Sequence, residues 1–166
     1  MFKKFFIQLK LKKLLKSVTK SEKSSNKVLL LIDLNHFQKD EVETVFYSLF
    51  NEDYELETIA FSLDKKQIKQ NFKHLFSVRD FSFFGNISNE ALKHKTNLNY
   101  LYVFQLFSNE NEYLNYLSAK SKTQLRVGLE NSNQQITDLS IKVNDKQLEL
   151  FFKEAKKYLE IIKKSA

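Results

Sequence analysis

The chain has 166 residues, of which 42% are hydrophobic and 28% charged, the size and composition of one globular domain rather than a disordered chain. Its formal net charge is +7. Lys, Asn, Phe and Ile are abundant, Pro and Trp are absent and Gly occurs twice, which is the codon bias of an AT-rich genome. The lysine surplus alone is therefore weak evidence for nucleic-acid binding. The absence of cysteine excludes disulfides, thiolate nucleophiles and Cys-ligated zinc, and together with the lack of a secretion signal it favours the cytoplasm.

The positive charge is concentrated at the start of the chain. Residues 1–27 hold nine lysines against one acid, Glu22, and so carry +8, whereas the other 18 basic and 19 acidic residues give −1. The charge distribution therefore indicates a basic arm on a nearly neutral body.

An amphipathic helix is predicted in this arm. One apolar face has helical spacing and consists of Ile7, Leu11, Leu14, Leu15 and Val18. A second apolar cluster, on roughly the opposite side, consists of Phe2, Phe5, Phe6 and Leu9. Lysines interrupt both groups, so neither a signal peptide nor a membrane span is predicted, and the polar residues 17–27 are interpreted as a linker.

Three interpretations of the arm remain open. It neutralises phosphates of RNA or DNA, it lies on an anionic membrane with its phenylalanines inserted, or it packs its leucine face on the domain and leaves its lysines solvated. The candidate anion-contacting residues are Lys3, Lys4, Lys10, Lys12, Lys13 and Lys16. The phenylalanines between these lysines favour a membrane slightly over a nucleic acid.

The rest of the chain alternates between predicted strands and predicted helices. Apolar runs predict strands at 28–32, 56–63, 81–84, 100–107 and 124–129, and a half-exposed edge strand at 139–143. Helices are predicted from Asp40 through Phe50, at 65–75, at 88–95, from a cap at Asn109 through Ala119, and over Asp145–Lys164 with Asp145 or Asn144 as N-cap. This order predicts a Rossmann-like α/β domain over 28–166, with a single three-layer, mostly parallel sheet behind the arm and linker of 1–27.

Several familiar chemistries are excluded by residue type. With Gly85 and Gly128 as the glycines of the chain, no dinucleotide fingerprint, P-loop or serine-hydrolase elbow can be formed. The histidines, His36, His74 and His94, are far apart and have no ligand partner at i+4, so no metal site and no cofactor are predicted.

The first candidate ligand site follows the first buried strand. Asp33, Asn35 and His36 lie where parallel sheets bind ligands, beyond the carboxyl end of a strand, and could hold a hydroxyl group or transfer a proton. The alternative is that Asp33 caps the following turn and His36 is merely exposed.

The second candidate combines Arg79 and Asp80 with the turn at 83–86. It would be an aromatic platform backed by an arginine; the alternative is a core aromatic strand, a surface ion pair and a turn with positive φ at Gly85 or Asn86. Gly128 indicates a bulge or a close backbone approach rather than a phosphate contact.

The whole chain resembles a family of uncharacterised proteins, a domain of unknown function associated with flavobacteria. The resemblance rests on the Lys-rich start, VLLLIDL at 28–34, RDFSFFGNI at 79–87, LSAKSKTQLRVGL at 117–129, and the edge strand with its long last helix. A weaker, fold-level resemblance is to the N-terminal lobe of heptosyltransferase-like glycosyltransferases, carried by the strand ending in Asp33-Leu34 and by Arg-Val-Gly at 126–128. Those enzymes bind the sugar nucleotide mainly through a second lobe, for which this chain has no room.

We therefore expect a non-catalytic cytoplasmic binding or adaptor protein, peripheral to the inner membrane, whose basic arm contacts an anionic surface of membrane or RNA. The alternative is a small enzyme or ligand-binding domain centred on Asp33 and His36. A protein partner also remains open, as does pairing of two copies through the edge strand at 139–143.

Overall fold

The computed structural model describes residues 2–18, 20–21, 25–50, 53–64, 75–144 and 146–165. Its strands are β1 (Lys27–Asp33), β2 (Glu55–Ser62), β3 (Leu75–Ser77), β4 (Asn99–Leu106), β5 (Lys122–Leu129) and β6 (Leu139–Ile141). Its helices are α1 (Phe2–Leu15), α2 (Lys39–Phe50), α3 (Glu90–Asn97), α4 (Glu112–Lys120) and α5 (Leu148–Lys164), with a short 3-10 turn, η3, at Val78–Asp80.

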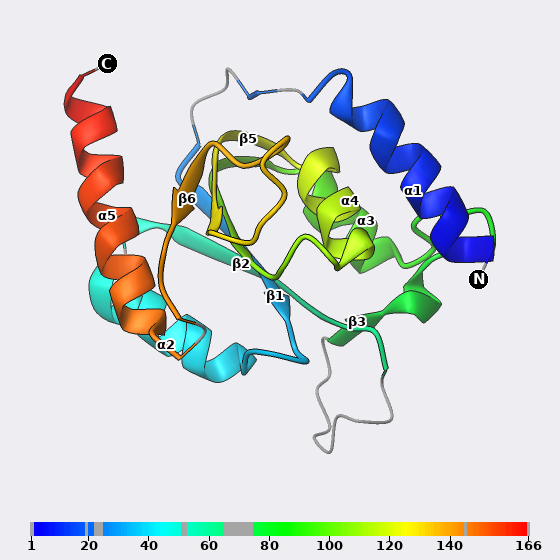
Figure 1. The fold of residues 1–166 in the computed structure, drawn as a ribbon, viewed down its shortest axis with the longest axis horizontal. Coiled ribbons are helices and arrows are strands. Elements are labelled where there is room, and N and C mark those ends of the chain that lie inside the picture. The colour runs from blue at the N-terminus through cyan, green and yellow to red at the C-terminus, as the bar shows by residue number, and fades with distance from the viewer. Residues whose placement is uncertain are drawn as a thin grey trace.

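The strands form one parallel sheet in the order β3-β2-β1-β4-β5-β6. Helices α2 and α5 cover one face, and α1, α3 and α4 cover the other (Figure 1). The predicted three-layer α/β fold is confirmed. From β1 the chain continues to β2 and β3 on one side of β1, and it then crosses to β4, β5 and β6 on the other side of β1. The strand order therefore reverses between β1 and β4.

Strand β1 shows why a continuous apolar run becomes the centre of this sheet. Val28, Leu30 and Ile32 pack into the core beneath α2 and α5, whereas Leu29 and Leu31 pack into the core beneath α1, α3 and α4. All five are fully buried, as expected for a strand covered on both faces.

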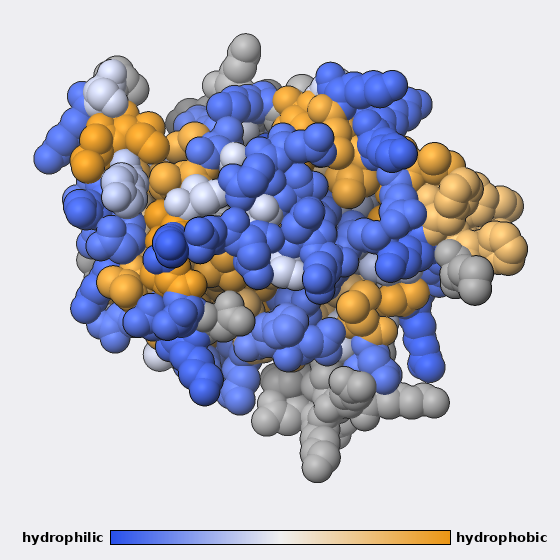
Figure 2. Space-filling model, in the orientation of Figure 1, coloured by the Kyte–Doolittle hydropathy of each residue, from blue (hydrophilic) through white to orange (hydrophobic). Residues whose placement is uncertain are grey.

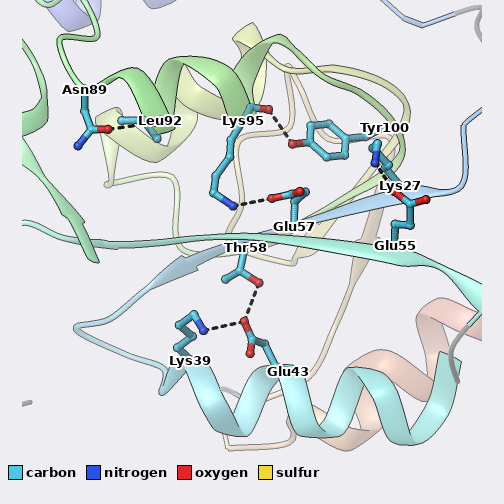
Figure 3. Close-up of polar contacts among 10 residues, drawn as sticks. All are labelled: Lys27, Lys39, Glu43, Glu55, Glu57, Thr58, Asn89, Leu92, Lys95 and Tyr100. Atoms are coloured by element: carbon cyan, nitrogen blue, oxygen red, sulfur yellow. Dashed lines mark hydrogen bonds and ion pairs between the residues drawn. The ribbon is translucent and has the colours of Figure 1, made fainter. Parts of the chain in front are cut away.

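Polar side chains tie β2 to helices on both faces of the sheet (Figure 3). On one face, Lys95 of α3 pairs with Glu57 at 2.5 Å, and the backbone carbonyl of Lys95 accepts a hydrogen bond from the Tyr100 hydroxyl at 2.6 Å. On the other face, the Thr58 hydroxyl donates to Glu43 of α2 at 2.8 Å. These contacts hold α2 and α3 on β2, which has fewer apolar residues than β1.

The predicted third strand is misplaced. The strand lies at Leu75–Ser77, and Phe81 forms a single antiparallel bridge with Ile87 while residues 82–85 form a turn. The aromatic run 81–84 resembled a strand, but Phe81 is its one core residue. The helix predicted at 65–75 lies outside the described residues except for Leu75, which begins β3.

Two predicted caps are also wrong. Asn111, not Asn109, caps α4, because its side chain accepts from the backbone N–H of Leu114. Helix α5 begins after Gln147 and has no side-chain cap, and Asn144 instead donates its backbone N–H to the Gln147 side chain at 3.1 Å. Asp145, the other predicted cap, lies outside the described residues.

Helix α1 is packed on the body along α4. Ile7 is fully buried and Leu11 is 8% exposed, the latter against Ala119 and Ile136. The predicted packing of the leucine face is confirmed, whereas the division of the chain at residue 27 stays a prediction.

Candidate functional site

The Asp33 carboxylate at the end of β1 is engaged in structural hydrogen bonds. Its Oδ1 accepts from the backbone N–H of Asn35 at 3.0 Å, and its Oδ2 accepts from Nδ2 of Asn111 at 3.0 Å. Asp33 is buried, so both oxygens serve to hold the turn after β1 and the start of α4. Asn35 and His36 are exposed, and the ring of His36 forms no hydrogen bond with a described residue.

A pocket of about 420 Å³ lies where the strand order reverses, and we call it the switch-point pocket. It is lined by Leu129, the last residue of β5, and by residues that follow β1, β4 and β5, namely His36, Phe37, Phe107, Ser108, Asn109, Glu110 and Asn131. The position is the one at which open α/β sheets bind ligands. His36 lines this pocket, but Asp33 does not.

Asp80, from the second candidate site, also has a structural role. Its Oδ2 accepts from the backbone N–H of Ser77 at 2.7 Å, and its Oδ1 accepts from Nδ2 of Asn89 at 2.9 Å. Arg79 is exposed and forms no ion pair with a described residue. The structure therefore does not join Arg79 and Asp80 into one charged site.

The turn after Phe81 packs against α1. Gly85 has φ +75°, as predicted, and a Cβ at this position would lie 3.2 Å from Cδ1 of Ile7. The Nζ of Lys10 donates to Asn86 at 2.8 Å. The turn is thereby held beside the second and third turns of α1.

This contact creates an exposed apolar surface, the phenylalanine patch. It consists of Phe2, Phe5, Phe6 and Leu9 of α1 with Phe83 and Phe84 of the turn; Phe6 is partly buried and the other five are between 46% and 64% exposed. The rings of Phe2 and Phe83 are 5.9 Å apart, and those of Phe6 and Phe84 are 5.3 Å apart. Figure 2 shows an apolar bulge at the α1 end of the molecule.

Part of the lysine charge on α1 is neutralised by the body and part is free. Lys4 lies 3.7 Å from Glu112, and Lys3 donates to the backbone carbonyl of Val78 at 3.0 Å. Among the lysines of residues 2–16, the exposed ones that form no ion pair with a described residue are Lys12 and Lys13 of α1 and Lys16 directly after it. The free positive charge thus lies at the C-terminal end of the helix that carries the phenylalanine patch.

Neither a metal centre nor a membrane span is found in the described part of the chain. No three His, Asp or Glu side chains there come close enough together to hold a metal ion. None of the helices in these ranges combines the length and the apolar character needed to cross a bilayer.

A model of the Family of unknown function (DUF6913) matches residues 3–162, nearly the whole chain. The chain belongs to this family. No curated protein and no solved structure matches it. The DUF6913 match includes α1 as well as the sheet, and the predicted membership of a family of unknown function is confirmed; the flavobacterial origin and the heptosyltransferase likeness stay predictions.

Sequence reasoning missed a buried arginine in this DUF6913 chain. Arg126 of β5 is 1% exposed, and its guanidinium donates to the backbone carbonyls of Ser118 at 3.0 Å and Ser121 at 2.5 Å. These carbonyls end α4, so Arg126 caps that helix through space. Burial lowers the pKa of Arg126 to about 10, and the negative charge of Asp138 partly offsets this lowering. In the sequence, the one indication that Arg126 is buried was its position as a single arginine in a predicted strand.

The composition of the phenylalanine patch was also only half foreseen. The sequence identified the residues of α1, but it placed Phe83 and Phe84 on a strand or a separate platform. Their juxtaposition with α1 depends on a contact between segments far apart in the chain, which no local pattern encodes.

Proposed function

We propose that this protein is a non-catalytic, peripheral membrane-binding adaptor that contacts an anionic lipid surface through α1 and the turn at 82–86. The observation that carries the proposal is the phenylalanine patch together with unpaired lysines at the C-terminal end of the same helix and directly after it. Such a surface can insert rings at the acyl boundary while ammonium groups lie among the headgroups. The proposal includes a cytoplasmic location on the inner membrane, whose cytoplasmic leaflet is anionic.

The two parts of the surface supply different energies. A lysine near an anionic surface contributes about 1 kcal/mol, and full burial of a Phe side chain about 1.5–3 kcal/mol. Three lysines and a few partly inserted rings therefore suffice for reversible binding.

RNA is less well matched to this surface. Single-stranded RNA stacks its bases on open aromatic faces. In the patch, Phe84 packs edge-on against Phe83 at 88° and against Phe6 at 72°, and Phe83 is tilted against Phe2 at 40°. Leu9, 46% exposed, offers no stacking face at all. The cluster has the form of an apolar wedge rather than a stacking platform.

Helix α5 carries a smaller rival surface with Tyr158, Ile161 and Ile162 exposed. Its lysines are accompanied by glutamates, and Lys153 pairs with Glu149 at 2.7 Å. Helix α1 has five lysines and no acid. The stronger attraction to anionic lipid is therefore expected at α1.

Co-sedimentation with vesicles tests the proposal. Wild-type protein should bind phosphatidylcholine vesicles that contain phosphatidylglycerol and not those of phosphatidylcholine alone. Replacing Lys12, Lys13 and Lys16 together by Gln should lower the partition coefficient on the order of a hundredfold, since three contributions of about 1 kcal/mol are lost. The matched control replaces Lys153, Lys157 and Lys163 of α5 by Gln and should bind nearly as wild type.

Removing apolar groups distinguishes a membrane from RNA. The double variant Phe5→Ser/Phe83→Ser should lose vesicle binding while keeping its lysines. Binding to a single-stranded RNA oligonucleotide, without binding to anionic vesicles, would overturn the membrane proposal and favour the RNA alternative.

The switch-point pocket favours a second candidate function, a ligand-binding domain or small enzyme that takes a small polar molecule beside His36. Saturation-transfer NMR with a mixture of nucleosides, sugars and amino acids tests it. A signal that disappears in Asn131→Leu supports this function, and a mixture without any signal removes it.

A further inference from the structure

A second cavity lies between α1, the start of α4 and the loops that follow β4 and β5, and we call it the α1 pocket. Its volume is about 480 Å³, within the range of small-molecule sites. Five amide side chains line it, those of Gln8, Asn109, Asn115, Asn133 and Gln135. The α1 wall adds Phe5, Leu9 and Lys12. One wall is thus amide-rich, and the other belongs to the proposed membrane surface.

Polar atoms at this pocket have unused hydrogen-bonding capacity. Asn115 is 1% exposed, and its Nδ2 donates to the backbone carbonyl of Asn109 at 2.8 Å and to the Asn109 side-chain oxygen at 3.3 Å. Both partners are acceptors, so the nitrogen must face them, and Oδ1 of Asn115 is left without a partner among the described residues. The Gln135 side chain also forms no hydrogen bond within the described chain.

Glu112 adds a second acceptor at the same place. Its Oε1 accepts from Nε2 of Gln8 at 2.5 Å, while its Oε2 lies 3.7 Å from Nζ of Lys4 and accepts no hydrogen bond from a described residue. The charge of Glu112 is thus offset by Lys4. Buried acceptors without donors are costly, and a ligand that brings donors would satisfy them.

This donor and acceptor set selects a class of ligand. Amides both donate and accept hydrogen bonds, and so do hydroxyl groups, whereas a bare phosphate or carboxylate would leave Asn115 Oδ1 and Glu112 Oε2 unpaired. Lys12 supplies one positive charge to the pocket lining. A molecule with one phosphodiester and several hydroxyls matches both features.

We infer that the α1 pocket binds the hydroxylated headgroup of an anionic phospholipid, with the phosphodiester near Lys12 and the hydroxyls among the amides. Glycerol and inositol headgroups share this chemistry. The inference rests on the proposed membrane binding, because Phe5 and Leu9 belong to both the pocket wall and the phenylalanine patch. A lipid held by these residues would have its headgroup within reach of the pocket.

Vesicles of equal charge and different headgroups test this inference. Phosphatidylglycerol and phosphatidylserine each carry one net negative charge, but the serine headgroup replaces the hydroxyls by an ammonium and a carboxylate. At equal molar fraction in phosphatidylcholine, the protein should bind phosphatidylglycerol about tenfold more tightly, the effect of one or two net hydrogen bonds. Asn133→Leu/Gln135→Leu should remove this preference without removing binding to phosphatidylserine vesicles. Asn97→Leu, an exposed amide at the opposite end of β4, is the matched control.

The outcomes separate the two proposals. Equal binding of the two lipids by wild-type protein overturns the headgroup inference and leaves the proposed function intact. Failure to bind either vesicle overturns the proposed function. Soluble glycerophosphoglycerol then tests the pocket alone by NMR: shifts at Asn115 and Gln135 support it, and no shifts refute it. This measurement uses wild-type protein and does not depend on the folding of any variant.

Discussion

Asp33, Asp80 and Arg126 carry charged side chains that form hydrogen bonds with backbone groups. These backbone groups lie at the ends of strands or short helices. Buried polar groups need such partners, and short elements leave many backbone groups without them. The sequence predicted Asp33 as either a ligand site or a turn cap and could not decide between them, because the partner Asn111 comes from a distant segment. For Asp80 the sequence offered a ligand site or a surface ion pair with Arg79, and it missed the cap that Asp80 forms with Ser77 and Asn89.

At the residue scale, Arg126→Met should reduce the free energy of unfolding by about 2–4 kcal/mol. The substitution keeps the side chain's bulk but leaves the Ser118 and Ser121 carbonyls without their donors. Urea denaturation followed by circular dichroism measures the loss. The control Arg79→Met, at an exposed position, should change stability by less than about 0.5 kcal/mol, and equal midpoints for the two variants would refute the capping role.

Gly128→Ala should destabilise the fold by about 1–3 kcal/mol. A Cβ at this position would lie 2.6 Å from Oγ of Ser132 and 2.8 Å from Nε2 of Gln105, so two hydrogen-bonded side chains would have to move. The same denaturation experiment tests it. An unchanged midpoint would show that the close approach is not required.

At the element scale, most helices and strands could be predicted from the sequence because their apolar residues form continuous runs or recur at helical or strand spacing. The continuous apolar runs of β1 and β4 and the two apolar sides of α1 were recognisable without tertiary information. Strand β3 was missed because its three residues do not alternate between apolar and polar side chains, whereas the equally short β6 lies in the strictly alternating segment 139–143. The α1 pocket could not be predicted, because α1, α4 and two separate loops supply its polar lining.

The docking of α1 predicts different costs for two substitutions on the same helix. Ile7→Ala should lower stability by about 2–4 kcal/mol, because Ile7 is fully buried. Leu9→Ala should change it by less than about 0.5 kcal/mol, because Leu9 is 46% exposed. Thermal unfolding distinguishes them, and equal small effects would indicate that α1 is not packed on the body in solution.

At the scale of the whole molecule, buried tyrosines couple stability to alkaline pH. Burial raises the pKa of Tyr100, Tyr102, Tyr113 and Tyr116 above the ordinary value near 10. The unfolded state therefore binds fewer protons than the folded state above this pH, and stability falls as pH rises. Arg126, whose pKa is lowered, acts in the opposite direction, but it is one group against these four tyrosines and Tyr54, whose pKa is also raised by burial.

Phenolate absorbance measures this coupling directly. These four tyrosines should ionise together with the loss of secondary structure, in one cooperative alkaline transition. A gradual ionisation of all seven tyrosines, with circular dichroism unchanged, would contradict the burial seen in the structure.

Because the exposed phenylalanines and the unpaired lysines gather at the α1 end of the molecule, we propose that this end contacts the membrane. The chain contains no tryptophan, so one introduced indole is a unique reporter. In Phe83→Trp, anionic vesicles with brominated acyl chains should shift the emission to the blue and quench it. In Tyr158→Trp, on α5 across the molecule from α1 (Figure 1), the emission should stay unchanged. Quenching of the reporter at position 158 but not of that at position 83 would contradict the claim.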